Sequence, residues 1–187
     1  MHVAVFVTAL GWMAVAGSES GISRVILPRQ SRDAAVEALE ITFGPAVTAF
    51  READTAAFDS LPSRLMCYME GHKVEFRDRV DTTGWTPFRT RVWNATRQIP
   101  YGQTWSYGQI AAAIGQPRAC RAVGQALHRN PVPVIVPCHR VVGADSSLTG
   151  FGSGLALKQA LLRLESAGKP SVDLEQSAAK QTRKPLL

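Results

Sequence analysis

The chain has 187 residues, of which 45% are hydrophobic and 19% are charged, with a formal net charge of +6. This composition is typical of a globular protein and excludes disorder over the whole length, and the length suits one ordinary domain or two small ones. Charge is uneven, with 8 Lys/Arg against 11 Asp/Glu in residues 1–84 but 9 against 2 in residues 85–165. The later segment has the charge of a module that meets phosphates, although a solvated basic surface would give the same count.

Residues 1–84 are predicted to form a small α+β domain. Three apolar runs separated by turn residues predict strands: Val3–Leu10, Trp12–Ala16 and Ile22–Leu27. Helices are expected over Ser31–Phe43, where Ser31 can serve as the cap and Gly44-Pro45 as the stop, and over Asp54–Tyr68. This domain, an antiparallel sheet with helices, shows no catalytic constellation. Its apolar start has no preceding Lys or Arg, and no segment of the chain is long enough to span a membrane, so we expect a cytoplasmic protein.

A second domain, mainly helical, is predicted over residues 85–166. Its boundary falls near Asp81–Trp85, and a polar tail, 167–187, is expected to be disordered. The predicted helices are Pro87–Gln98, Ser106–Ile114, Pro117–His128 and Leu155–Ser166. Ser106 and Gln109 have the spacing of a capping box, and the short turn at Gly115 joins two helices in a helix-turn-helix pattern. The fold class is therefore α+β.

The second helix of that pair has an unusual composition. Arg118, Arg121, Ala122 and Gln125 share one face, and Ala119 and Ala122 keep the helix thin. A thin helix with arginines on one face can approach a nucleic-acid groove closely. The alternative is a solvated stripe of charge on a helix that packs by its small residues. The helix-turn-helix pattern alone does not decide between the two, because many enzymes also contain one.

Three widely spaced cysteines, Cys67, Cys120 and Cys138, exclude a disulfide framework and a Cys-x-x-Cys site, and they favour a reducing compartment. We predict neither a metal nor a cofactor. Cys138 lies in an apolar run, where a lone thiol is usually structural and inert. Here His139 follows it directly, and a Cys-His pair needs a third group to orient the imidazole. The basic segment offers only Asp145 and Glu165 as carboxylates.

These residues resemble a known family, the O6-alkylguanine-DNA alkyltransferases, from about Thr86 to Glu165. The resemblance rests on Pro100-Tyr101-Gly102, Ser106-Tyr107, Arg121-Ala122-Val123-Gly124, Asn130-Pro131, Pro137-Cys138-His139-Arg140-Val141 and Gly150-Phe151-Gly152. It implies DNA repair by direct reversal, in which the protein takes the alkyl group from O6-alkylguanine, and from O4-alkylthymine if the family's wider range applies. One protein would repair one lesion, because a thioether does not regenerate the thiol.

The resemblance also implies roles for particular residues. Cys138 would be the acceptor, His139 a general base acting through a water, and Glu165 the group that orients the imidazole. Asn130 would hold the active-site turn, and Tyr107 would give a proton to the flipped base. Arg121 would fill the gap left in the duplex. The remaining contacts implied are Ala119, Ala122, Gln125, Ser106 and Arg118 toward DNA, and Phe151, Gly152, Val141 and Tyr107 in the substrate pocket.

The chain departs from the family at Phe151, where many relatives have Tyr, and at Cys120, often Ala. The partner implied is double-stranded DNA containing alkylated guanine, bound by a monomer; the site of action would be the nucleoid of a bacterium or the nucleus of a eukaryote. Three alternatives remain open: a helix-turn-helix regulator, a relative that binds lesions without transfer, and a thiol hydrolase.

Overall fold

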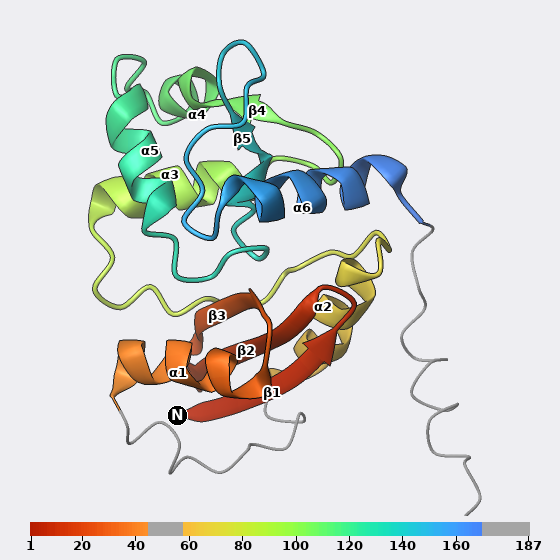
Figure 1. Ribbon diagram of the computed structural model, residues 1–187. Coiled ribbons are helices and arrows are strands. Elements are labelled where there is room, and N and C mark those ends of the chain that lie inside the picture. The colour runs from red at the N-terminus through yellow and green to blue at the C-terminus, as the bar shows by residue number, and fades with distance from the viewer. Residues whose placement is uncertain (45–57, 170–187) are drawn as a thin grey trace, which may run out of the picture.

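The computed structural model describes residues 1–44 and 58–169. Figure 1 shows two layers. The lower layer is a three-stranded sheet with two helices, and the upper layer is a group of helices. The lower layer contains β1 (His2–Thr8), β2 (Gly11–Ser18), β3 (Gly21–Arg29), α1 (Arg32–Phe43) and α2 (Leu61–Met69). The upper layer contains α3 (Pro87–Arg97), β4 (Trp105–Ser106), α4 (Tyr107–Ala113), α5 (Cys120–His128), a 3₁₀ helix (Cys138–Arg140), β5 (Val141–Val142) and α6 (Leu155–Ala167). The predicted α+β class is confirmed.

The sheet is antiparallel in the order β1-β2-β3, and both of its faces are covered. Successive side chains on a strand point to opposite faces. Ala14 and Ala16 of β2 pack with Ala35 and Leu39 of α1 in a small core. Met13 and Val15, on the other face, join a larger core that also contains residues of α3, α5 and α6. The sheet therefore connects the two layers through side-chain packing.

Two helices begin at the capping residues that the sequence predicts. The Ser31 side chain accepts from Ala34 N, and Ser106 and Gln109 form both bonds of the capping box on α4. Thr86 caps α3 in the same way, through Arg89 N. These polar side chains satisfy backbone N–H groups that have no partner inside the helix.

Two predicted helix starts are wrong. The helix predicted over Asp54–Tyr68 begins at Leu61; residues 54–57 lie outside the described residues, and Asp59 has a φ of +51° that no helix permits. Pro62 fits the first turn, where a missing N–H costs nothing. The helix predicted from Pro117 begins at Cys120, because Ala119 N donates to Gln116 O across a turn. Pro117 takes the second position of that turn, which also suits its fixed φ.

One hydrophobic core crosses the predicted domain boundary near residue 84. It joins Met13, Leu61 and Tyr68 to Trp93 and Leu161. Backbone bonds reinforce this contact, since Val25 N donates to Pro131 O at 2.9 Å. The division at 84/85 stays a prediction. The tail predicted over 167–187 is wrong at its start, because Ala167 still belongs to α6 and Lys169 N donates to Gly71 O at 2.9 Å. Residues 170–187 lie outside the described residues.

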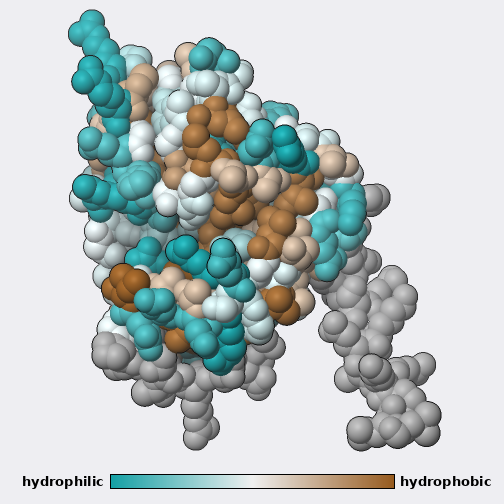
Figure 2. All heavy atoms as spheres, viewed as in Figure 1, coloured by the Kyte–Doolittle hydropathy of each residue, from teal (hydrophilic) through white to brown (hydrophobic). Residues whose placement is uncertain are grey.

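On the face seen in Figure 2, hydrophobic residues gather over α6, and Leu155 at the start of that helix is 47% exposed. Among the described residues, no helix combines the length and apolarity needed to cross a membrane.

Candidate active site

Cys138 lies at the start of the 3₁₀ helix Cys138–Arg140 and is 8% exposed. The loop before it is held by Asn130, whose Nδ2 donates to Val136 O at 2.8 Å and to Cys138 Sγ at 3.1 Å. The Asn130 side-chain oxygen accepts from Val132 N. Val134 in this loop has a φ of +74°, a strained value for a β-branched residue. These bonds fix the loop around the thiol of Cys138.

Burial raises the pKa of the Cys138 thiol above its ordinary value. The hydrogen bond from Asn130 and the positive charge of Lys158 act in the opposite direction and offset only part of this effect. The resting thiol is therefore protonated at neutral pH, and a base is needed to make it a nucleophile.

His139 is fully buried, and its Nε2 lies 2.9 Å from Oε1 of Glu165. Burial lowers the pKa of the imidazole, although Glu165 raises it in part, so the ring is neutral at neutral pH. With Nε2 carrying the proton toward Glu165, as this geometry assigns it, Nδ1 has a free lone pair. Nδ1 has no hydrogen-bond partner among the described residues, and it can therefore accept a proton.

Glu165, near the end of α6, is held as a carboxylate. Arg140 donates from Nε and Nη2 at 2.8–3.1 Å, and the backbone N–H of Gly102 donates at 3.1 Å. Burial alone would raise the pKa of Glu165, but hydrogen bonds from His139 and Arg140 outweigh it and lower the pKa to about 2. A fixed negative charge therefore lies behind the imidazole.

Tyr68 belongs to this network, and sequence reasoning missed it. Its hydroxyl donates to Oε1 of Glu165 at 2.6 Å and lies 3.1 Å from Nε2 of His139. Tyr68 comes from α2, in the part of the chain for which we predicted no catalytic constellation, and that prediction is incomplete. The sequence offers no signal for it, because its partners lie 71 and 97 residues away.

Lys158 is the second missed residue. It is fully buried in α6, and its ammonium donates to Val141 O at 2.6 Å and to Thr149 O at 2.8 Å. It ties together the two ends of the loop that follows Cys138, and its charge lowers the pKa of that thiol. A lysine on the inner face of the predicted helix Leu155–Ser166 was the signal available.

The thiol opens into a cavity of about 210 Å³. Phe151 and Gly152, two of the predicted pocket residues, line it together with Asn130 and Pro133. Tyr107 stands at the start of α4 and donates its hydroxyl to Thr149 O. Val141 lies elsewhere, fully buried in the core and paired with Trp105.

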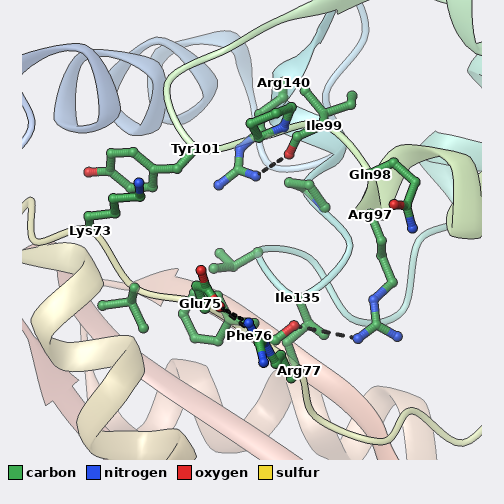
Figure 3. A pocket seen from close by; sticks show the side chains of 14 residues that line it. Lys73, Glu75, Phe76, Arg77, Arg97, Gln98, Ile99, Tyr101, Ile135 and Arg140 are labelled. Carbon is green, nitrogen blue, oxygen red and sulfur yellow. Dashed lines mark hydrogen bonds and ion pairs between the residues drawn. The ribbon is translucent and has the colours of Figure 1, made fainter. Parts of the chain in front are cut away.

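A second cavity, of about 340 Å³, lies beside the network (Figure 3). Arg140 and Tyr101 reach it from above in this view, and Phe76 and Arg77 from below. The third guanidinium nitrogen of Arg140, Nη1, donates to Ile99 O at 2.7 Å. Cys138 is absent from the described lining, so this cavity does not open onto the thiol.

Five of the six predicted DNA-facing residues lie on α5 or directly before it, and the sixth, Ser106, caps α4. Arg118, Arg121, Ala122 and Gln125 are exposed, whereas Ala119 and Ser106 are half-buried. Val123, Ala126 and Leu127 hold the opposite face of α5 in the core. Cys120 is exposed at the start of this helix. Within the described residues, no group of three or more His, Cys, Asp or Glu side chains could hold a metal.

Comparison with known proteins places this site in a family. Residues 87–167 match the model of the 6-O-methylguanine DNA methyltransferase DNA-binding domain. The methylated-DNA–protein-cysteine methyltransferase of Mycobacterium tuberculosis H37Rv is 47% identical over 133 residues, 71% of this chain and 79% of that protein. The Methanosarcina acetivorans protein of the same name is 41% identical over 170 residues, 88% of this chain and 98% of its own.

A solved structure agrees with these matches. The M. tuberculosis OGT crystallised in complex with DNA is 39% identical, with a TM-score of 0.72 over 93% of this chain and 98% of that one. The family resemblance read from the sequence is thereby confirmed, and the chain belongs to the methylated-DNA–protein-cysteine methyltransferases.

Proposed function

We propose that this protein repairs duplex DNA by taking the alkyl group from O6-alkylguanine onto its own Cys138. The observation that carries the proposal is a buried thiol next to a neutral His139. The Nε2 atom of this imidazole is hydrogen-bonded to the carboxylate of Glu165, which leaves Nδ1 free to accept a proton. The names of the relatives and the DNA complex of one of them support it. Such a protein acts where DNA is, in the cytoplasm or nucleoid of a bacterium or the nucleus of a eukaryote.

The reaction is a displacement at the alkyl carbon. His139 accepts the thiol proton at Nδ1 through a water, and Sγ attacks the alkyl carbon, forming a C–S bond as the C–O6 bond breaks. The electron pair of the broken bond goes to O6, and guanine leaves as the neutral base once Tyr107 donates a proton. The thiol proton returns to Tyr107 through solvent, so charge balances.

Glu165 and Asn130 position the reacting groups. Glu165 stabilises the imidazolium that forms on His139, and its other oxygen is fixed by Gly102 and Arg140. Asn130 donates to Sγ, which stabilises the thiolate as it forms. Because the product is a thioether, no step restores the thiol, and each molecule acts once.

The DNA side of the proposal rests on α5. Base flipping brings the lesion to the cavity at Cys138, lined by Phe151 and Gly152. Arg121 occupies the gap in the stack, and Arg118 and Gln125 contact the backbone beside it, where the small side chains of Ala119 and Ala122 allow close approach.

The test is the mass of the protein after incubation with a duplex carrying one O6-methylguanine. We expect one added methyl group, located on Cys138 by peptide mapping, and no further turnover. Cys138→Ala should abolish transfer while leaving DNA affinity nearly intact, because phosphate contacts supply most of that affinity. Lesion removal by Cys138→Ala would refute the acceptor assignment. Sequence-specific binding without mass gain would favour a helix-turn-helix regulator.

A further inference from the structure

The loop that precedes Cys138 borders two cavities. Asn130 and Pro133 line the cavity that contains the thiol. Three other residues of this loop line the second cavity, of about 340 Å³, namely Val134, Ile135 and Pro137 (Figure 3). The two described linings have no residue in common. The second cavity is therefore a separate space, which the proposed reaction leaves without a role.

Positive charge predominates in the described lining of this second cavity. Four of its side chains are basic and one is acidic: Lys73, Arg77, Arg97, Arg140 and Glu75. Arg140 is paired with Glu165. Arg77 is paired with Glu75 at 2.7 Å, but both side chains are exposed, and a surface pair of this kind contributes little to stability. The other two basic side chains have no carboxylate partner among the described residues.

Arg97, at the end of α3, is held in place at the edge of the cavity. Its Nη2 donates to Phe76 O at 3.4 Å and to Asp78 O at 3.1 Å, and Figure 3 draws the first of these bonds. Nε and Nη1 have no hydrogen-bond partner in the described part of the chain, and neither is fully buried. Lys73 is exposed, and its ammonium likewise has no described partner. Two cations are thus available to an anion, and one of them is already oriented.

The cavity continues as a groove along the end of α3. An adjoining hollow of about 490 Å³ has four lining residues in common with it and adds Asn94, the common ones being Phe76, Arg77, Arg97 and Gln98. Asn94 and Gln98 are exposed and four residues apart, so their amides lie on one face. In the view of Figure 3, Lys73 and Arg97 lie on opposite sides of the cavity. The positive charge is therefore spread along the groove and is not gathered at one point.

A groove with spread cations suits a chain of phosphates better than one small anion. Proteins that hold a nucleic-acid strand regardless of its sequence combine a positively charged groove with aromatic side chains. Phe76 and Tyr101 supply aromatic surface in this lining. We propose that the groove binds the phosphodiester backbone of a nucleic-acid strand, as a second contact surface apart from α5. The protein then holds one DNA segment on α5 and another strand here.

The first experiment asks whether the two surfaces are occupied together. The protein is saturated with a short unmodified DNA hairpin without adenine in its loop, which occupies α5, and an oligothymidylate of about 12 nucleotides is then added. Native mass spectrometry should show a complex of one protein, one hairpin and one oligothymidylate. Displacement of the hairpin by the oligothymidylate, with no such ternary complex, would overturn the second surface.

The second experiment assigns the strand to the groove. Lys73→Gln should weaken oligothymidylate binding to the hairpin complex severalfold and lower its salt slope by about 0.7, the value for one single-strand phosphate contact. Because this ammonium has no described partner, its loss should leave the fold intact, and Arg97→Gln should weaken binding in the same way. Arg91→Gln, an exposed arginine of α3 outside both described linings, is the matched control and should change neither value. Equal effects of Lys73→Gln and Arg91→Gln would overturn the assignment.

Thymidine monophosphate distinguishes a strand from a small organic phosphate, because it carries the same base and one phosphate. It should compete with oligothymidylate only at concentrations far above that of the oligonucleotide, since it occupies one part of the groove. Equal competition per phosphate would assign the groove to small phosphates and overturn the inference. No arm of these experiments uses a lesion, so a wild type that fails to transfer methyl would refute the proposed function alone.

Discussion

At the scale of single residues, the carboxylate of Glu165 is where hydrogen bonds from four residues meet. It accepts from Tyr68, His139, Arg140 and the backbone of Gly102. Breaking a buried pair by removing one charge leaves the other uncompensated. Substitution of Glu165 therefore removes the counter-charge of the His139 imidazolium and leaves the buried Arg140 guanidinium without its carboxylate partner.

We expect Glu165→Gln to slow methyl transfer about a hundredfold or more, because the imidazolium loses its counter-charge. The rate should also rise with pH up to the thiol's own ionisation, since an unaided thiol reacts only as the thiolate. Single-turnover rates across pH measure both effects. A profile that superimposes on that of the wild type would remove His139 and Glu165 from the proton path.

Tyr68→Phe should slow transfer severalfold and shift the acid limb of the pH profile upward. Without this donor, Glu165 becomes a stronger base and raises the pKa of His139, which must be neutral to accept a proton. Tyr101→Phe is the matched control, because its hydroxyl donates to the carbonyls of Gly71 and Leu164 and to no other group among the described residues. It should lower stability by about 1 kcal/mol and leave the pH profile in place. Identical profiles for both variants would show that Tyr68 is only a packing residue.

At the scale of elements, α5 carries the DNA side of the proposal. Its buried face is fixed by Val123, Ala126 and Leu127, so Arg121 is held on the outer face without a described salt-bridge partner. A side chain that fills the gap in a base stack helps only when a base must be flipped.

Arg121→Ala should therefore slow repair of duplex DNA strongly and matter little for free O6-benzylguanine, which needs no flipping. Arg118→Ala is the comparison. As a backbone contact it should weaken binding to all DNA about equally and lower the salt slope by roughly one unit. Transfer rates at saturating duplex and free base distinguish the two. Equal loss on both substrates would give Arg121 a role in the pocket.

The elements also show how far the sequence leads. Strands and capped helices follow from local patterns, as at Ser31 and Ser106, and the Cys138 motif identifies the family. The predicted start of α5 is wrong because a proline such as Pro117 fits a β-turn and the first turn of a helix equally well. Tyr68 and Lys158 could not be predicted as site residues, because tertiary packing brings them to the site and local sequence patterns carry no information on contacts between residues so far apart in the chain.

At the scale of the whole molecule, the buried charges make stability depend on pH. The Glu165 pKa is lowered to about 2 in the folded protein, against about 4.3 in an unfolded chain. Its contribution is therefore complete above the unfolded value and is lost as pH falls toward 2. His139, with its lowered pKa, adds a loss of the same sign that begins below about 6.5.

Denaturation by urea at a series of pH values should show stability falling from about pH 6 downward, with a second fall below about pH 4. Glu165→Gln should be less stable at neutral pH and should lose that second, acidic fall. A wild-type stability that stays constant between pH 6 and pH 3 would contradict the ionisation states assigned to both residues.

The bond from Tyr68 to Glu165 has a consequence for engineering. Residues 87–167, the part that matches the family model, form a contiguous segment that invites transfer into another protein. That segment carries the thiol, the imidazole and the carboxylate, but one hydroxyl that orients the carboxylate comes from α2. A graft would keep every residue of the sequence motif and still arrive with an incomplete relay, unless the host scaffold supplied a donor at the same place.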